Sequence, residues 1–242
     1  MNKLINQNNL KCFAYENGEL INGNILGITI NFYGLGCQNM NKSHTDIGKF
    51  FAGNNILFVE PYLNPWSWMN KQAILVTDEI IQVIKDKYNI KNTPIVSSGN
   101  SMGGQQALIY SLYSKNNIIA CITNCPVCDL VFHYSERDDL PRTLYSALFW
   151  EDGDINSALA KYSPLHQVLN MPKIKYVIYH CDKDTAVNIN SHSKLFVKQM
   201  KENGFDITLN IVKDREHCNL DEDSRNNYNN DIILSITKGS SF

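Results

Sequence analysis

The chain has 242 residues, a length typical of one α/β domain or of two small domains. Its 43% hydrophobic and 19% charged residues supply a large core and exclude intrinsic disorder. The formal charge of -2, without any basic run, argues against a nucleic-acid partner, which needs many phosphate contacts.

Neither a membrane span nor a secretion signal is visible. No stretch approaches 18 consecutive apolar residues, so we expect no membrane partner. The N-terminus, Met1–Cys12, is polar and has no cleavage site. The seven cysteines are an odd number in a chain large enough to fold without disulfides. We therefore expect reduced thiols and a cytoplasmic location.

The order of predicted elements indicates an α/β fold. The first segment, Lys11 to about Phe32, has turn signals at Asn17-Gly18 and Asn22-Gly23, which predict antiparallel hairpins. Apolar runs then predict strands at 55–59, 94–98, 118–123, 174–179 and 206–212. Helical periodicity predicts helices at 69–88, 103–113, 191–202 and 224–237. This alternation predicts a mostly parallel, twisted sheet with helices on both faces.

One segment, from about Cys128 to Met171, breaks this alternation. It contains short helical pieces rich in aromatic and charged residues. We predict a single domain, residues 1–242, in which 128–171 form a small helical cap, or lid, over the sheet edge.

The strongest local signal is Gly99-Asn100-Ser101-Met102-Gly103, a G-x-S-x-G sequence between a predicted strand and a predicted helix. A serine on such a sharp turn projects its hydroxyl above the carboxyl ends of the strands, and a Cβ at either glycine would collide with neighbouring elements. The Met102 N–H, at the start of the helix, is then free to bind an oxyanion. A turn that merely links strand and helix is the alternative, but the context favours a nucleophile.

Two later strand ends carry the partners that a serine nucleophile needs. The loop after 174–179 contains Asp182 and Asp184, and His217 follows strand 206–212. Carboxyl ends of parallel strands meet at one edge of a sheet. The sequence therefore predicts a triad in which His217 is the general base for Ser101 and an aspartate orients the imidazole.

These motifs resemble those of the α/β-hydrolase superfamily, and within it the prolyl-oligopeptidase-like hydrolases and small serine esterases. The resemblance extends from about Ile25 to the C-terminus and rests on GNSMGG (99–104), SPL (163–165), HCDKDTAVN (180–188) and EHC (216–218). It implies the α/β-hydrolase fold. In that family the acid lies four residues after a strand-end histidine and three before a valine, which selects Asp184. Several positions depart from the family's usual pattern, and they leave the subfamily and substrate open: Cys181, Asn188, Glu216 and Cys218.

A second oxyanion donor is expected from the loop after strand 28–32. Similar esterases have His-Gly-Gly there, whereas the oligopeptidase branch has a tyrosine whose hydroxyl helps to hold the oxyanion. Tyr33 matches the second pattern. The backbone N–H of Gly34 or Leu35 is an alternative donor, and a Tyr33 that only packs under the loop is another.

Signals for the substrate are weaker. Trp66 and Trp68, after the strand at 55–59, and Phe149 and Trp150, in the cap, are candidate contacts for an apolar acyl or aryl group. Aromatic residues also pack any cap, so this assignment has a structural alternative.

The remaining titratable residues suggest neither metal nor cofactor. Cys125-Pro126-Val127-Cys128 is a lone C-x-x-C without a second ligand pair, which favours buried thiols over a zinc site. His180 is expected to orient the acid loop. Cys181 and Cys218 adjoin predicted catalytic residues, which could make activity sensitive to thiol oxidation.

Together these features predict a serine hydrolase, most simply a carboxylesterase that cleaves a short acyl ester through an acyl-enzyme and needs no metal or organic cofactor. The expected partner is a small-molecule ester or a short peptide, and the oligomeric state is left open. A small prolyl-oligopeptidase-like peptidase is the close alternative. The large oligopeptidases carry a propeller domain that filters substrates, and 242 residues leave no room for one. A non-catalytic ligand-binding homologue is the alternative from another class.

Overall fold

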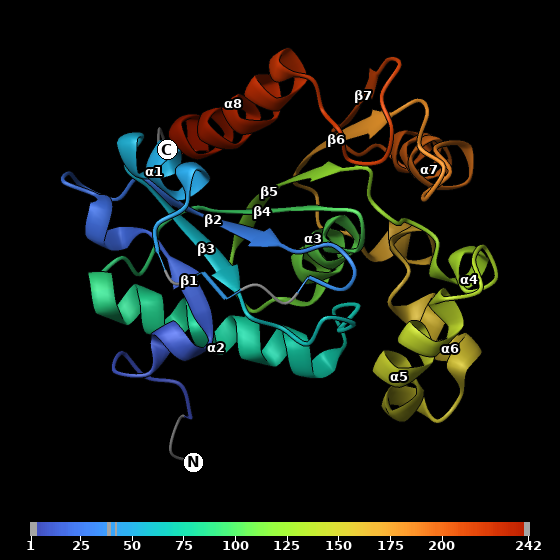
Figure 1. Cartoon of the computed structure of the whole chain (residues 1–242), viewed down its shortest axis with the longest axis horizontal. Coiled ribbons are helices and arrows are strands. Elements are labelled where there is room, and N and C mark those ends of the chain that lie inside the picture. The colour runs from blue at the N-terminus through green and yellow to red at the C-terminus, as the bar shows by residue number, and fades with distance from the viewer. Residues whose placement is uncertain (1–3, 38–39, 42, 240–242) are drawn as a thin grey trace.

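The computed structural model describes residues 4–37, 40–41 and 43–239. Its centre is a seven-stranded sheet in the order β1-β3-β2-β4-β5-β6-β7 (Figure 1). The strands are β1 (Ala14–Glu16), β2 (Gly27–Phe32), β3 (Ile56–Pro61), β4 (Ile95–Asn100), β5 (Ile118–Asn124), β6 (Lys175–Cys181) and β7 (Ile207–Val212). Strand β1 pairs antiparallel with β3, and all the other neighbours in this sheet pair parallel. The prediction of a mostly parallel sheet is confirmed.

Helices cover both faces of the sheet, as predicted. One face packs against α1 (Asp46–Gly53) and α8 (Glu222–Gly239), and the other against α2 (Lys71–Tyr88), α3 (Met102–Tyr113) and α7 (Leu195–Glu202) (Figure 1). Strand β3 shows how the sequence divides the two cores. Ile56 and Phe58 contribute to the α1–α8 core, whereas Leu57 and Val59 contribute to the other. Successive side chains of a strand point to opposite faces, so a continuous apolar run fills both cores.

Local signals explain the helix boundaries. The side chains of Thr45 and Asn70 accept the N–H groups of Gly48 and Ala73 and thereby cap α1 and α2. The predicted helix at 191–202 divides into a π-helical turn, η4 (Asn190–Lys194), and α7. No helix among the residues described is both long and apolar enough to cross a membrane.

The N-terminal segment differs from the sequence prediction of antiparallel hairpins between Lys11 and Phe32, which is wrong. Short 3-10 turns, η1 (Leu10–Cys12) and η2 (Gly18–Leu20), flank β1, and β1 pairs with β3. The reason lies at Asn17, which is completely buried. Its Nδ2 donates to the carbonyls of Gly48 and Ile56, and its Oδ1 accepts the N–H of Phe58. The predicted turn residue therefore connects distant elements, which local turn propensity cannot reveal.

The segment assigned to the cap lies between β5 and β6. It contains α4 (Leu130–His133), α5 (Leu140–Asp152), α6 (Ile155–Lys161) and the 3-10 helix η3 (Pro164–Asn170), and α4, α5 and α6 gather at the lower right of Figure 1. Hydrogen bonds fix it to the rest of the domain. The indole N–H of Trp68 donates to Thr143 Oγ1 at 3.2 Å, and Gln105 Nε2 donates to the Tyr162 carbonyl at 2.8 Å.

Helix α3 approaches the sheet so closely that two glycines are required, as the sequence predicts. A Cβ on Gly99 would meet the backbone of Gly103, and a Cβ on Gly103 would meet the carbonyl oxygen of Phe32 in β2. Both obstacles are backbone atoms, which cannot rotate away.

The substitution Gly103→Ala should therefore destabilise the fold by at least about 1–3 kcal/mol, because the added methyl must push α3 away from β2. Urea unfolding monitored by circular dichroism measures this free energy. The control is Gly53→Ala, because a Cβ there meets nothing within 4 Å. We expect that variant to equal the wild type or to gain up to about 1 kcal/mol. Equal unfolding free energies for the two variants would contradict the close-approach argument.

Candidate active site

The predicted nucleophile lies on a strained turn between β4 and α3. Ser101 has φ 57° and ψ -123°, a conformation that residues with a Cβ rarely adopt. The turn is held on both sides, because the Ser101 N–H donates to the Asn124 carbonyl at 2.9 Å and its own carbonyl accepts from Gly104 at 3.0 Å. The backbone thus fixes the direction in which the hydroxyl points.

The structure brings Ser101, His217 and Asp184 together in one chain of hydrogen bonds. His217 Nδ1 lies 2.6 Å from Asp184 Oδ2, and His217 Nε2 lies 2.9 Å from Ser101 Oγ. An ionised carboxylate can only accept, so Nδ1 carries a proton, and in the neutral imidazole Nε2 is free to accept the serine proton. The three residues come from loops after β4, β6 and β7, at the carboxyl ends of the strands. This is the arrangement of a nucleophile, a general base and an orienting acid.

Asp184 is held rigidly inside its loop. Its side chain is fully buried, and its Oδ1 accepts the N–H groups of Ala186 and Val187, each at 2.9 Å. His180 contacts the same loop, because its Nε2 lies 3.1 Å from the Val187 carbonyl oxygen and 3.3 Å from Asp184 Oδ2. Ser193 Oγ, 2.7 Å from His180 Nδ1, fixes the imidazole's other side. His180 therefore positions the acid and does not reach the serine.

Burial and hydrogen bonding act in opposite directions on the pKa values of this pair. Burial alone raises the pKa of Asp184, but hydrogen bonds from His180, His217 and the Val187 N–H outweigh it and hold that pKa well below its usual range. Burial lowers the pKa of His217, whereas the hydrogen bond and charge of Asp184, with a contribution from Cys125, raise it to about 9. Asp184 is therefore a carboxylate that stabilises a protonated imidazole.

The oxyanion side combines helix α3 with the loop after β2. The Met102 N–H is at the first residue of α3, where an N–H has no acceptor within the helix. A Cβ on Gly34 would lie 3.8 Å from Ser101 Cβ, so the loop passes directly beside the nucleophile. The hydroxyl of Tyr33 is already engaged, because it donates to Glu60 Oε2 at 2.7 Å.

Glu60 is a buried carboxylate that sequence reasoning missed. It also accepts Asn31 Nδ2 and Asn41 Nδ2, each at 2.8 Å. Burial raises the pKa of Glu60 although the three hydrogen bonds oppose this shift. It lies at the end of an apolar strand, and only the three-dimensional contacts with Tyr33, Asn31 and Asn41 distinguish it.

For the four aromatic residues predicted to contact substrate, the structure shows packing contacts. Trp68 is buried, with 1% of its surface exposed, and bonds to the cap, whereas Trp150 is 86% exposed on α5. Trp66 packs against the Arg142 guanidinium, and Phe149 stacks on Tyr145. Among the described residues that line the cavities next to the nucleophile turn, none of these four is found.

A cavity of about 270 Å³ lies near the nucleophile turn, although none of Ser101, Asp184 and His217 is among the described residues that line it. Its polar wall includes Asn100, Asn124 and Cys218, the neighbours of Ser101, Cys125 and His217, and its apolar wall includes Phe51 and Leu220. Asn124 is buried, and its Oδ1 has no hydrogen-bond partner among the residues described.

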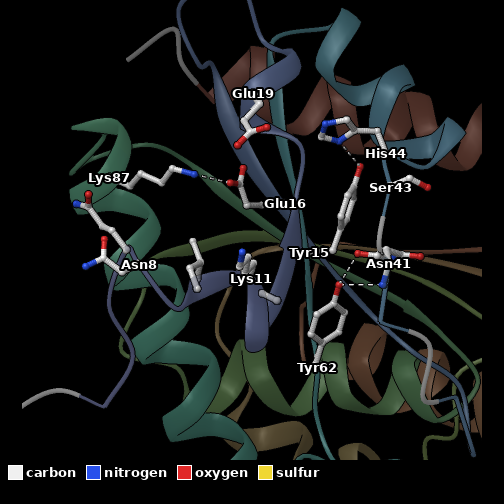
Figure 2. A pocket seen from close by; sticks show the side chains of 13 residues that line it. Asn8, Lys11, Tyr15, Glu16, Glu19, Asn41, Ser43, His44, Tyr62 and Lys87 are labelled. Atoms are coloured by element: carbon white, nitrogen blue, oxygen red, sulfur yellow. Dashed lines mark hydrogen bonds and ion pairs between the residues drawn. The ribbon is translucent and has the colours of Figure 1, made fainter.

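A larger cavity, of about 460 Å³, lies around β1 and contains no nucleophile paired with a base among the described residues that line it. Figure 2 shows one ion pair in it, in which Lys87 Nζ lies 2.7 Å from Glu16 Oε1. Tyr15 faces His44 on its other side. Its chemistry does not suggest a reaction.

Three clusters in the described part of the chain have donor atoms close enough to hold a metal ion: Cys125–His217–Cys218, Cys125–His180–Asp184 and His133–Glu136–His192. In the third, Glu136 Oε2 accepts from His133 Nδ1 at 2.6 Å and from His192 Nε2 at 3.0 Å. This buried network joins the cap to η4, and the lone positions of these residues in the sequence gave no signal of it. Cys125 and Cys128 are free and buried, as predicted.

Comparison with solved structures shows the same fold in peptidases and esterases. Acylaminoacyl peptidase of Pyrococcus horikoshii superposes with a TM-score of 0.62 at 15% identity, over 84% of this chain and 35% of its own. Dipeptidyl peptidase 4 of Porphyromonas gingivalis gives 0.67 at 15% identity, over 88% and 31%. The esterase Est2 of Thermogutta terrifontis gives 0.64 at 18% identity, over 93% and 85%. The chain thus spans about a third of the length of the two peptidases and most of the esterase.

At the sequence level, no curated protein matches this chain significantly. The sequence profile of the prolyl oligopeptidase family, however, matches residues 76–235, which include all three triad residues and the cap. Together with the shared fold, this match confirms the resemblance that the motifs indicate: the chain belongs to the prolyl oligopeptidase family of α/β-hydrolase-fold serine hydrolases.

Proposed function

We propose that this protein hydrolyses carboxylic esters with a short acyl group through an acyl-enzyme. The observation that carries this proposal is the continuous hydrogen-bond chain from Ser101 Oγ through His217 to Asp184. A serine is a weak nucleophile without such a base, and an imidazole needs an anionic partner to stabilise its protonated form.

The geometry supports a two-step reaction. Ser101 Oγ attacks the ester carbonyl while His217 Nε2 takes the hydroxyl proton, and Asp184 stabilises the resulting imidazolium. The tetrahedral intermediate collapses, and its alcohol leaves with the proton from His217. Water then attacks the acyl-Ser101 ester with His217 again as base, which releases the acid and restores the serine.

The oxyanion of the intermediate requires two donors. The Met102 N–H supplies one, because the N-terminus of α3 points at the turn. For the second we propose a backbone N–H of the Gly34–Leu35 loop, because the Tyr33 hydroxyl is committed to Glu60. Of the two kinds of donor that the sequence allows, we thus favour the backbone N–H over the Tyr33 hydroxyl.

The likeness to an esterase over most of both chains supports an ester substrate. The aromatic cap residues are not needed for this assignment.

A peptidase activity is the second candidate, favoured by the family to which the chain belongs. Turnover of peptidyl arylamides, compared with p-nitrophenyl esters of increasing chain length, separates the two activities.

Substitution of Ser101 tests the nucleophile. Ser101→Ala should lower p-nitrophenyl acetate and butyrate turnover by at least about 10⁴-fold and abolish labelling by a fluorophosphonate, because the acyl-enzyme cannot form. The control is Ser146→Ala, which changes an exposed serine on α5 and should retain both activities. If the wild type neither turns over these esters nor reacts with the fluorophosphonate, the protein is a ligand-binding homologue.

The pH dependence of turnover tests the general base. Only neutral imidazole accepts the serine proton, so kcat/KM should fall as the pH drops through the His217 pKa of about 9. Asp184→Asn removes the charge that raises this pKa. The midpoint should then move to the ordinary histidine value of about 6.5 or below, and kcat should fall roughly 10⁴-fold. Asp182→Asn, two residues away and exposed, should leave the profile in place; a midpoint that moves in this control instead would reassign the acid.

Substitution of Tyr33 tests the oxyanion donor. Tyr33→Phe should keep kcat within about tenfold of wild type, whereas loss of a true oxyanion donor costs about 10²–10³-fold. The variant should still unfold more easily, by about 1–3 kcal/mol, because buried Glu60 loses a donor. Tyr62→Phe, in the same polar cluster, is the matched control. A hundredfold loss of kcat confined to Tyr33→Phe would assign the tyrosine hydroxyl to the oxyanion.

A further inference from the structure

Two thiols lie at the edge of the triad, and both come from strained backbone. Cys125 follows β5 with φ 46°, and Cys218 follows His217 with φ 56°. Like Ser101, they adopt left-handed conformations that residues with a Cβ avoid unless the surrounding structure enforces them. Cys125 is fully buried, whereas Cys218 is partly exposed and lines the cavity near the nucleophile turn.

The donor atoms of Cys125, Cys218 and His217 all lie within 4.8 Å of one another. Cys218 Sγ is 3.5 Å from His217 Nε2. A tetrahedral zinc ion with bonds of about 2.3 Å to sulfur and 2.0–2.1 Å to nitrogen places those two atoms roughly 3.5 Å apart. Small movements of the cysteine side chains would therefore complete a Cys₂His set.

The surrounding groups are those that support metal ligands. Asp184 accepts a hydrogen bond from the Nδ1–H group of His217, which leaves Nε2 as the nitrogen that can coordinate a metal. The Cys125 sulfur accepts the backbone N–H groups of Cys181 and Cys218, each at 3.4 Å. The hydrogen bond with Cys181 lowers the pKa of Cys125, but the contact with Cys218 and burial outweigh it and raise that pKa to about 11, so the thiol loses its proton only when a metal replaces it. The hydrogen bond to Asp184 and the two N–H donors to Cys125 are both present in the metal-free site.

The His133–Glu136–His192 cluster is a weaker candidate. Its two nitrogen–oxygen contacts, 2.6 and 3.0 Å, are hydrogen bonds, shorter than the separation of roughly 3.3 Å that tetrahedral zinc would impose. The second nitrogen of His192 accepts two backbone N–H groups, so this network is complete without a metal.

We infer that Cys125, Cys218 and His217 Nε2 form a binding site for a thiophilic divalent cation of the Zn²⁺ class, and that its occupation inhibits the hydrolase. Binding displaces the two thiol protons, and also the Nε2 proton when His217 is protonated, and it forms two metal–sulfur bonds and one metal–nitrogen bond. The lone pair of Nε2 then binds the metal and cannot accept the Ser101 proton. The inhibition rests on the proposed hydrolase function, whereas the binding does not.

Co²⁺ titration of the full chain tests binding without any assay of activity. A thiolate-to-cobalt charge-transfer band should appear in the wild type and in Ser101→Ala, which retains all three ligands. It should be lost in Cys218→Ser and in His217→Ala. Cys12→Ser, which changes an exposed cysteine in η1, is the control and should keep the band. Absence of the band in wild type, or its persistence in Cys218→Ser, would overturn the site.

Inhibition is tested with Zn²⁺ in a phosphine reductant that keeps thiols reduced. The Zn²⁺ concentration for half-inhibition should rise at least about 100-fold in Cys218→Ser, since loss of even a supporting residue costs 10–100-fold in affinity. A chelator should restore wild-type activity, and inhibition should strengthen with pH because thiol protons must leave. Equal inhibition of wild type and Cys218→Ser would place the inhibitory ion elsewhere. If no ester or arylamide is turned over, the hydrolase function fails, while the cobalt band still decides the site.

Discussion

The buried negative charge of Asp184 is the feature on which the site depends. An isolated carboxylate in this position would be strongly disfavoured, because burial penalises the charged form. Two backbone N–H groups in its own loop, His180 and His217 compensate for that penalty. Because the charge is fixed, the imidazole of His217 is held in one tautomer and presents Nε2 to Ser101. The loop that contains Asp184 thus holds the carboxylate charge beside the His217 imidazole.

Rigidity on the serine side has a different origin. Ser101 is fixed by backbone strain and by the contact between α3 and β2, where Gly99 and Gly103 leave no space for a side chain. The cap stabilises the arrangement from a distance through Trp68 and Gln105, which join the loop after β3 and helix α3 to it. Ser101 and His217 are therefore positioned by independent parts of the chain, and their alignment is a property of the whole sheet.

The positions that could be predicted from the sequence are those that a local pattern determines, such as a residue that directly follows an apolar strand. Ser101, Asp184 and His217 follow apolar strands, and the parallel sheet brings strand ends together. The hairpins failed because Asn17 is bonded to Gly48, Ile56 and Phe58, far along the chain. Tyr33 and Glu60 likewise depend on a contact across 27 residues that no motif encodes. For the four predicted aromatic contacts, residue type alone could not distinguish packing of the cap from binding of substrate.

The cysteines are another case in which a contact between distant residues could not be predicted from the sequence. This contact also affects the chemistry of the site. Cys125-x-x-Cys128 has the spacing of a metal pair, yet the structure turns Cys125 toward a partner 93 residues away, Cys218. A general base must offer an unprotonated nitrogen with a lone pair directed at the reacting atom, and a metal ligand must offer the same. The hydrogen bond from Nδ1 to Asp184 improves His217 in both roles. In the site that we propose, two thiols beside such a nitrogen make the proposed base susceptible to soft cations. A glycine in place of Cys218 would supply no such ligand.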